Sequence, residues 1–380
     1  MKITDITSHP LRCKIDQSFA YSQKWLEHRS ALLVKVETDE GVSGWGECFC
    51  HDAWPALVAL IDRVYKPLVI GQDPLAREVI WSLLYNWTRD YGQKGLTTAA
   101  ISGIDIALWD IAGKVAGLPV SKLLGGNFTS RVEAYATGLY LTQRAIEDPM
   151  ALQEEAVAYA EEGFKGIKMK VGFGLAADVR NVKLVRQAVG DSIKLMVDAN
   201  HAYPPSVSIR LAQHLEHLGV FWFEEPVIPE DLDGYCEVRQ ATTVPIAGGE
   251  AEFTRYGFLQ LLSRRCVDVV QPDLCICGGI SEAKKIAALA SAFGTQLVPH
   301  VWGTGIAIAA ALHFIASLSS EPPSLNSEPS MLELDRTENA IRDGSSVGQL
   351  AAVDGYVAVP KGPGLGIDID ETFLEKYKVF

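Results

Sequence analysis

The chain has 380 residues, 48% of them hydrophobic and 21% charged, which is ordinary for a globular protein and excludes disorder as its main state. The 34 Lys and Arg residues against 47 Asp and Glu residues give a formal net charge of −13. Without a basic block, this balance argues against nucleic acid or an anionic membrane as the partner. At roughly 150 residues per domain, the length allows two or three domains, or one large barrel with an addition.

The apolar segments indicate neither a membrane span nor a signal peptide. The most apolar window, residues 305–318, is too short to cross a bilayer and contains His313. The N-terminus lacks the apolar middle of a signal peptide. The cysteines include the C-x-C pairs Cys48/Cys50 and Cys275/Cys277 but no C-x-x-C spacing, so we expect reduced thiols in a cytoplasmic protein.

The N-terminal region up to residue 127 predicts a small α+β domain. Residues 2–12 alternate between polar and apolar, and the apolar runs 30–38 and 42–48 flank an acidic-glycine turn, which is typical of antiparallel strands. Residues 53–70 have helical spacing, and residues 98–116 are apolar almost throughout, which indicates a buried helix.

From residue 131 onward, short β-rich runs alternate with amphipathic segments. Repeated βα units of this length predict a closed (β/α)8-type barrel, which we place at residues 128–330. The predicted strands begin near residues 131, 166, 193, 221, 245, 267, 295 and 324.

The competing architecture is an open, doubly wound sheet that binds a nucleotide. Its one candidate motif is Gly172-x-Gly174-x-x-Ala177, directly after a predicted strand. An isolated motif of this kind is weak evidence, and the glycines fit a barrel loop beside an active site better. A non-catalytic or nucleotide-binding protein built around this loop is the alternative from a different functional class.

Carboxylates end three adjacent strands of the predicted barrel. Asp198, Glu224 and Glu250 are each 26 residues from the next, and in such a barrel the carboxyl ends of the strands carry the active site. Three convergent carboxylates cannot all stay ionised in one pocket without a cation. Because the ligands are all oxygen atoms, we expect Mg²⁺, with Mn²⁺ as the second choice. Glu225 should point to the opposite face of its strand.

Two lysines share one face of the second strand. Lys168 and Lys170 are two residues apart, so both ammonium groups should enter the same pocket. Each disfavours the charged form of the other, which should lower at least one pKa and provide a neutral lysine as a base. We therefore expect both lysines to be catalytic.

A histidine and an aspartate end the seventh and sixth strands. Asp273 can fix the tautomer of His300 through a hydrogen bond and raise the basicity of the other ring nitrogen. His214 and His217, on a predicted helix, fit surface residues instead. Two bases on opposite sides of a metal site suit removal of the proton α to a carboxylate. Glu328 should enter this pocket from the eighth strand.

Several motifs match jointly, and through them the sequence resembles the mandelate racemase subgroup of the enolase superfamily over nearly the whole chain. Within it, the sequence is similar to the galactarolactone cycloisomerases. The first resemblance rests on Lys168-x-Lys170, Asp198-x-Asn200, Glu224-Glu225-Pro226, Gly249-Glu250, Asp273, His300 and Glu328. The second rests on RDYGQKGLT (89–97), SGIDIALWDIAGK (102–114), WFEEPVIPE (222–230), QPDLCICGG (271–279) and VPHVWGTG (298–305).

The resemblance implies a role for each of these residues. Lys170 and the His300–Asp273 dyad would be the two acid/base groups, the three carboxylates would bind one Mg²⁺, and Glu328 would hydrogen-bond the substrate carboxylate. The implied reaction opens an aldarolactone ring by α-proton abstraction and loss of the ring oxygen, giving a 3-deoxy-2-keto acid. Residues 1–127 would form the cap, and residues 331–380 would return to it.

The substrate is left open, because residues 16–28, where such caps select the substrate, match the subgroup poorly. An open-chain sugar-acid dehydratase, an epimerase or a racemase would use the same half-reaction. We expect residues 16–28 and 47–54 to close over the barrel mouth. We also expect a small carboxylate substrate and a homo-oligomer. The candidate substrate contacts are Tyr21, Trp25, His51, Trp54 and Asn200.

Overall fold

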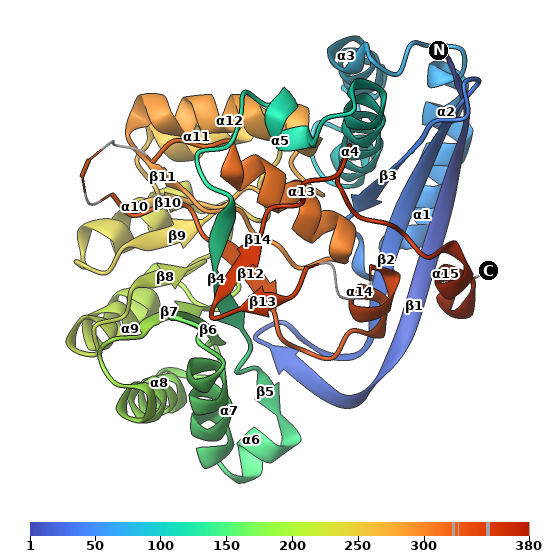
Figure 1. Cartoon of the computed structure of the whole chain (residues 1–380). Helices are drawn as coiled ribbons and strands as arrows, with labels where there is room; N and C mark the ends of the chain where they lie inside the picture. Colours follow the sequence, from blue (N-terminus) through green and yellow to red (C-terminus); the bar gives the residue numbers. More distant parts are fainter. Residues whose placement is uncertain (321–323, 326, 347–349, 380) are drawn as a thin grey trace.

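The computed structural model describes residues 1–320, 324–325, 327–346 and 350–379. Figure 1 shows a barrel with a capping domain at its side, and the chain begins and ends in the cap. This confirms the expected fold class, a (β/α)8-type barrel with an α+β cap.

An antiparallel sheet forms one layer of the capping domain. Its strands lie in the order β3-β2-β1-β5, namely β3 (Ser43–Cys48), β2 (Lys24–Thr38), β1 (Ile3–Tyr21) and β5 (Leu141–Thr142). The antiparallel strands expected in the first 48 residues are therefore confirmed. β1 and β2 also continue through the segment 16–28 as a long hairpin, from Ile3 opposite Thr38 to Tyr21 opposite Lys24.

The helices of the cap pack against this sheet around a shared apolar cluster. They are α1 (Trp54–Leu60), α2 (Lys66–Val69), α3 (Arg77–Thr88) and α4 (Leu96–Ala116), with a 3-10 turn at His51–Ala53 and a π-helical turn at Ile61–Tyr65. The short helix α5 (Val120–Leu123) follows and packs with the apolar residues shared with the barrel.

Helix α4 is the buried helix that the sequence predicts. It lies so close to β3 that a Cβ added at Gly46 would stand 1.8 Å from the carbonyl oxygen of Gly103, so only glycine allows this approach. The helix is long and apolar enough to cross a membrane, but 83% of its apolar window is buried inside the protein, as in a core helix.

Parallel strands form the barrel. Ladders join β4, β6, β7, β8, β9, β10 and β11 in that order, and β12 pairs with the other edge of β4. The strands are β4 (Arg131–Thr137), β6 (Gly166–Lys170), β7 (Lys194–Asp198), β8 (Trp222–Glu224), β9 (Ile246–Gly248), β10 (Val269–Val270), β11 (Gln296–Leu297) and β12 (Leu332–Asp335).

Helices surround these strands on the outside of the barrel (Figure 1). They are α6 (Gln143–Glu147), α7 (Met150–Glu161), α8 (Leu175–Val189), α9 (Pro205–His217), α10 (Leu232–Gln240), α11 (Thr254–Ser263), α12 (Gly279–Phe293) and α13 (Gly305–Ala316). His214 and His217 are exposed on α9, as expected.

The eighth strand lies later in the chain than predicted. The expected strand near residue 324 is wrong, because β12 spans Leu332–Asp335 and pairs in parallel with β4. In β12 the side chains of Leu332 and Leu334 are buried, whereas Leu325 is fully exposed. Burial of the alternating apolar residues therefore selects the later segment, and the barrel extends past the predicted boundary at residue 330.

The C-terminal segment returns to the cap, as expected. After α14 (Ala340–Ser345), the strands β13 (Ala352–Val353) and β14 (Tyr356–Ala358) form a hairpin, and β14 pairs with β4. Helix α15 (Glu371–Tyr377) then reaches the cap sheet, where the amide of Val379 donates to the carbonyl of Pro10 at 3.0 Å. The Nζ of Lys35 also lies 2.7 Å from a carboxylate oxygen of Glu371.

Candidate active site

A cavity of about 180 Å³ lies where the carboxyl ends of the barrel strands meet the cap. The barrel contributes charged side chains, and the cap contributes mostly uncharged and aromatic ones. The barrel residues are Tyr140, Lys170, Asn200, His201, Glu250, Ala251, Ile276, His300, Trp302 and Glu333. The cap residues are Tyr21, Gln23, Phe49 and His51.

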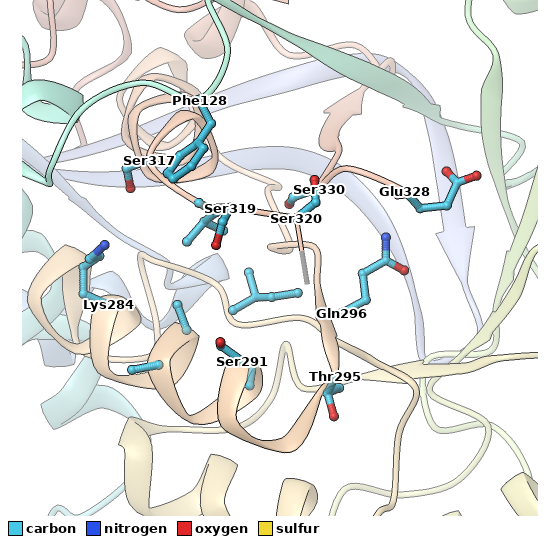
Figure 2. Close-up of a pocket in the computed structure, with 15 residues that line it drawn as sticks. Phe128, Lys284, Ser291, Thr295, Gln296, Ser317, Ser319, Ser320, Glu328 and Ser330 are labelled. Atoms are coloured by element: carbon cyan, nitrogen blue, oxygen red, sulfur yellow. The ribbon is translucent and has the colours of Figure 1, made fainter. Parts of the chain in front are cut away.

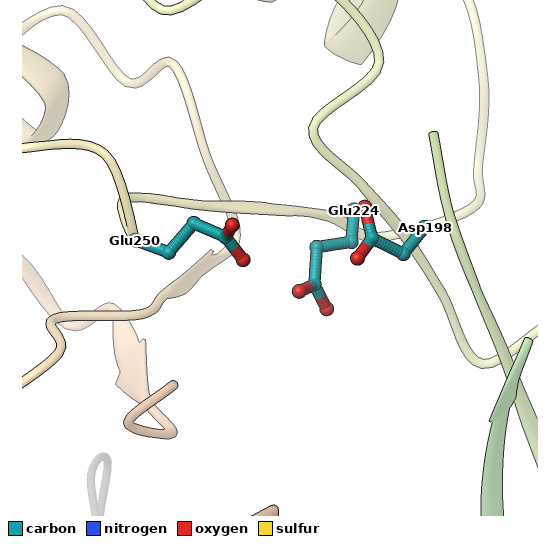
Figure 3. A group of neighbouring side chains, drawn as sticks. All are labelled: Asp198, Glu224 and Glu250. Carbon is teal, nitrogen blue, oxygen red and sulfur yellow. The ribbon is translucent and has the colours of Figure 1, made fainter. Parts of the chain in front are cut away.

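Three carboxylates lie together beside this cavity, at the ends of β7, β8 and β9. Asp198, Glu224 and Glu250 each offer an oxygen atom, and these atoms all lie within 4.8 Å of one another. Figure 3 shows the carboxylates of Asp198 and Glu250 reaching inward from the two sides of Glu224. Oxygen Oε2 of Glu250 is buried without a hydrogen-bond partner among the described residues. This oxygen lies 3.5 Å from His300 Nε2 and completes an all-oxygen donor set, which fits a hard divalent cation.

The other oxygens of this group face cations and hydrogen-bond donors. Lys168 Nζ lies 2.7 Å from Glu224 Oε1, and Lys170 Nζ lies 2.5 Å from Asp198 Oδ2. The side chains of Trp222 and Gln271 donate to Glu224 Oε2 at 3.0 and 2.8 Å. The carboxylates of Asp198 and Glu224 are thus held in place by neighbours, while that of Glu250 borders the cavity.

The two lysines differ in their exposure to the cavity. Lys168 is fully buried, whereas Lys170 lines the cavity. Burial favours the neutral form of both, yet Glu224 and Glu333 hold the pKa of Lys168 well above its usual value. Asp198 likewise raises the pKa of Lys170 against the effect of burial. With the protein's own groups alone, the carboxylates attract each ammonium group more strongly than the other ammonium group repels it, so the pKa of each lysine is raised and not lowered as expected.

The predicted dyad is formed. His300 Nδ1 lies 2.6 Å from Asp273 Oδ2, and His300 Nε2 lies 3.5 Å from Glu250 Oε2. Burial lowers the pKa of His300, but Glu250, Glu333 and Asp273 outweigh it and raise the pKa to about 10. Both ring nitrogens of His300 thus face carboxylates, Nδ1 that of Asp273 and Nε2 that of Glu250, which lines the cavity.

Glu328 lies away from this site. Its carboxylate is 55% exposed and pairs with Lys194 Nζ at 2.9 Å. It borders a second cavity of about 240 Å³, lined by Phe128, Gln296 and Ser330 near the starts of β4, β11 and β12 (Figure 2). Because the starts and ends of parallel barrel strands lie at opposite ends of the barrel, Glu328 cannot reach the cavity with Lys170. The expectation for Glu328 is corrected on this geometry.

Glu333 of β12 occupies the place expected for Glu328. Its Oε1 lies 2.7 Å from Lys168 Nζ and accepts from the hydroxyl of Thr137 at 2.7 Å. Its Oε2 accepts from the amide of Val301 at 3.0 Å, which links β12 to the segment that follows His300. Lys168 lowers the pKa of Glu333 to about 2, although burial opposes this. The apolar alternation of MLELD at 331–335 is the signal that would have identified this residue.

The cap reaches the mouth of the barrel through the tip of the β1–β2 hairpin. The hydroxyl of Ser22 donates to the carbonyl of Ala199 at 2.7 Å, and Gln23 Nε2 donates to that of Asn200 at 2.7 Å. Of the predicted substrate contacts, Tyr21, His51 and Asn200 line the cavity. Trp25 is 46% exposed, and neither it nor Trp54 lines the cavity, so these expectations are corrected.

Left-handed backbone conformations gather beside the carboxylates. Asn200, His201 and Glu225 have φ angles of 42°, 66° and 45°, which are unfavourable for side chains of this size. The buried atoms Asn200 Oδ1 and His201 Nδ1 lack hydrogen-bond partners in the described part of the chain. Such strain and free polar atoms are typical of sites that receive a ligand. Glu225 turns toward Asn200 and His201, outside the carboxylate group.

The backbone amides of the glycine loop after β6 are hydrogen-bonded to side chains of the protein. The amides of Gly172 and Phe173 donate to Asp178 at 2.9 and 3.1 Å, and the amide of Gly174 donates to the hydroxyl of Tyr203 at 2.8 Å. These amides are not available to a phosphate, so the nucleotide-binding alternative loses its site.

Fold and site together define a barrel enzyme of the enolase superfamily, an isomerase or lyase. Residues 7–125 match the mandelate racemase / muconate lactonizing enzyme N-terminal domain, and residues 151–373 match the enolase C-terminal domain-like family. The chain therefore belongs to the mandelate racemase / muconate lactonizing enzyme family, which confirms the resemblance seen in its sequence.

Curated and structural relatives span nearly the whole chain. The D-galactarolactone cycloisomerase of Agrobacterium fabrum is 45% identical, covering 100% of this chain and 99% of the relative. The arabinonate dehydratase of Saccharolobus solfataricus is 36% identical, covering 93% and 92%. The crystal structure of the 3,6-anhydro-D-galactonate cycloisomerase from Zobellia galactanivorans superposes with a TM-score of 0.90, at 43% identity and full coverage of both chains.

Proposed function

We propose that this protein is a Mg²⁺-dependent cycloisomerase that opens the oxygen ring of a sugar acid by β-elimination. The observation that carries the proposal is one cavity that receives Lys170 from β6 and His300 from the end of β11, beside three clustered carboxylates. Two acid/base groups that enter from opposite sides of the barrel suit proton removal at one position and proton delivery at another. The similarity to two cycloisomerases supports the same reaction class.

Asp198, Glu224 and Glu250 would hold the metal ion. A bound Mg²⁺ stabilises the charge that develops on the substrate carboxylate and offsets the carboxylates that raise the pKa of the lysines. Lys168 then holds Glu224 and Glu333 in place from the interior. Glu333, beside the cavity, can accept a hydrogen bond from the substrate.

Lys170 removes the proton α to the substrate carboxylate. The ring oxygen on the β-carbon leaves with the electron pair of its C–O bond and takes a proton from His300, which Asp273 orients. The α-carbon carries a hydroxyl group, so the product is an enol that rearranges to a 3-deoxy-2-keto acid. The hydrogen bond between Asp273 and Nδ1 of His300 leaves Nε2 as the ring nitrogen that can donate a proton in the cavity, which suits the role of His300 as the acid.

The cap side of the cavity narrows the substrate class. Its lining side chains, Tyr21, Gln23, Phe49 and His51, carry no Lys or Arg, and burial lowers the pKa of His51 to about 4 so that it is neutral. A second carboxylate in this position would lose its hydration without gaining a partner. The substrate therefore has one carboxylate and an uncharged ring, as an aldarolactone such as galactarolactone has.

An anhydro sugar acid is the second candidate, because it also combines one carboxylate with an uncharged five-membered oxygen ring. The structural relative named as a 3,6-anhydro-D-galactonate cycloisomerase supports this candidate. Dehydration of an open-chain acid would use the same bases, and the similarity to an arabinonate dehydratase keeps that reaction as the alternative.

A substrate panel separates these candidates. We would incubate the protein with Mg²⁺ and galactarolactone, 3,6-anhydrogalactonate, galactarate, galactonate or arabinonate, and measure the keto acid as its semicarbazone. We expect turnover of a ring monocarboxylate and none of galactarate. Turnover of the open-chain acids alone would overturn the cycloisomerase proposal in favour of a dehydratase.

Deuterium exchange separates the two bases. Lys170→Ala should abolish both turnover and exchange of the α-hydrogen in heavy water, because no other base reaches that face. His300→Asn should keep the exchange while losing product. Exchange that survives in Lys170→Ala and disappears in His300→Asn would reverse the assignment, and normal turnover in both variants would refute proton abstraction by these groups.

A further inference from the structure

Two carboxylates of the cap are buried without an ion pair to Lys or Arg among the described residues. Glu47 of β3 is 3% exposed and Asp105 of α4 is 2% exposed. Among the described residues, neither forms an ion pair with Lys or Arg within 4.0 Å. A buried, unpaired carboxylate is costly, so each should have hydrogen-bond donors that compensate it.

The donors of Glu47 lie at the start of barrel helix α13. The amide of Thr304 donates to Oε1 at 3.0 Å, the hydroxyl of Thr304 to Oε2 at 2.6 Å, and the amide of Ala307 to Oε2 at 3.1 Å. A Cβ at Gly303 would stand 2.6 Å from Glu47 Oε1, so glycine makes room for the carboxylate. Glu47 of the cap thus accepts hydrogen bonds from the N-terminus of barrel helix α13.

Asp105 makes the same arrangement with helix α12. Its Oδ2 accepts from the amide of Ser281 at 2.9 Å, and its Oδ1 accepts from the hydroxyl of Ser281 at 2.6 Å. Here too a glycine makes room, since a Cβ at Gly279 would stand 2.4 Å from Asp105 Oδ2. The neighbouring Ser102 of α4 accepts from the amide of Gly278 at 2.9 Å.

These two helices directly follow the residues of the dyad. Asp273 lies between β10 and α12, and His300 lies between β11 and α13. Only residues 301–304 separate His300 from α13, and Val301 in that segment is held by Glu333. The position of each helix N-terminus therefore limits where its dyad residue can lie.

We propose that Glu47 and Asp105 are positioning residues that couple the cap to the His300–Asp273 dyad. Glu47 fixes the segment that carries His300, and Asp105 fixes the segment that carries Asp273. Neither touches the cavity, so both act through the helices that they bind. The proposal rests on the proposed function for its kinetic consequences, but the placement of His300 can be tested without turnover.

The test compares Glu47→Gln and Asp105→Asn with a control variant at Asp110, which lies in α4 as Asp105 does. Asp110 is also buried, but it accepts from the amides of Trp45 and Leu365 and pairs with Lys114, and among the described residues it has no hydrogen bond to the N-terminus of α12 or α13. Asp110→Asn therefore removes a buried carboxylate of the cap without touching the dyad. Activities are expressed per folded protein, measured by circular dichroism.

We expect kcat of Glu47→Gln and Asp105→Asn to fall by about 10- to 100-fold, because small misplacements of catalytic groups cost this much. The Lys170-dependent exchange of the α-hydrogen should fall less than product formation, which needs His300. In Asp110→Asn the ratio of exchange to product formation should equal that of the wild type. A wild-type ratio in both Glu47→Gln and Asp105→Asn would overturn the proposal.

A second measurement is independent of the substrate. The ring ¹⁵N signals of His300, assigned by their loss in His300→Asn, should shift in Glu47→Gln and Asp105→Asn and stay unchanged in Asp110→Asn. Unchanged signals in all three folded variants would overturn the coupling, even if Glu47→Gln were inactive. If the wild type acts on no acid of the panel, the proposed function fails, while this spectroscopic test still decides the positioning role.

Discussion

Lys168 and Lys170 are two residues apart on β6, yet their surroundings give them different roles. Lys168 Nζ lies 2.7 Å from both Glu224 and Glu333 and has no exposed surface. It can balance buried charge, but it cannot reach a substrate. Lys170 lines the cavity, so among the two lysines it alone can act as a base.

Metal binding should depend on each carboxylate of the cluster. In Glu224→Ala one of three ligands is lost, so Mg²⁺-dependent turnover should fall to background and Mg²⁺ affinity by roughly tenfold or more. The fold should survive, because barrel strands are held mainly by their apolar layers. Isothermal titration calorimetry and circular dichroism measure the two effects. Full activity of this variant, or of the wild type in excess chelator, would refute the metal site.

Glu333 and Glu328 provide a matched pair of substitutions. Glu333→Gln breaks a buried ion pair with Lys168, which should lower the free energy of unfolding by about 3 kcal/mol and abolish turnover. Glu328→Gln removes an exposed pair with Lys194, which should cost less than about 1 kcal/mol and leave turnover unchanged. Denaturant titration and the keto-acid assay measure both. A larger loss of turnover in Glu328→Gln than in Glu333→Gln would contradict the placement.

Many of the candidate site residues were predictable because each follows a short apolar run. Asp198, Glu224, Glu250 and His300 could be assigned to one end of the barrel from strand order alone. Glu333 was missed because residues 324–329 resemble a strand end as well, although the apolar alternation at 331–335 and its burial favour the later segment. The charge state of the lysines depends on oxygen positions that no sequence spacing reveals.

At the scale of helices and strands, the N-termini of α12 and α13 are where the cap binds the barrel. Because the strands β10 and β11 are short, the positions of Asp273 and His300 depend largely on the helices that follow these strands. Such contacts between domains have no local sequence signal. The continuation of the β1–β2 hairpin through residues 16–28 was also missed, because the pattern there mixes exposed and buried positions.

The buried carboxylate of Glu47 should make the stability depend on pH. Burial raises its pKa from 4.5 to about 7, although the donors at Thr304 and Ala307 oppose this. Between these values the folded protein keeps a proton that the unfolded chain has lost, so the free energy of unfolding falls as pH rises through this range. The contribution is on the order of 3 kcal/mol.

In Glu47→Gln the free energy of unfolding should therefore fall less steeply between about pH 4.5 and pH 7 than in the wild type. Burial also raises the pKa of Asp105 to about 7, so Asp105→Asn should reduce this fall as well. Urea titrations at several pH values measure the slope. The same slope in the wild type and in both variants would show that these carboxylates are not the groups that bind the extra proton.

At the scale of the whole molecule, one apolar cluster extends across the cap and the barrel, beside a second cluster that lies within the cap. The shared cluster contains Leu11 and Trp45 of the cap sheet, Ile106 of α4, Leu374 of α15 and many apolar residues of the barrel strands and helices. The N-terminal match up to residue 125 and the barrel match from residue 151 are thus separate in sequence but not in packing. The sequence predicts a cap and a barrel, but it does not show that they depend on each other.

This shared cluster predicts that cap and barrel unfold together. Separating them would expose Leu11, Trp45 and Ile106 to water, at about 1.5–3 kcal/mol for each large side chain. Urea should therefore give one transition, and amides of β2 and β7 should lose protection from hydrogen exchange at the same urea concentration. A fragment of residues 1–127 should lack a cooperative transition, because Leu11, Trp45 and Ile106 would lose their partners in the barrel. Loss of protection in β2 at a much lower urea concentration than in β7, or cooperative unfolding of the fragment, would show that the cap is an independent unit. The coupling of Glu47 to the dyad would then operate only while the two domains stay docked.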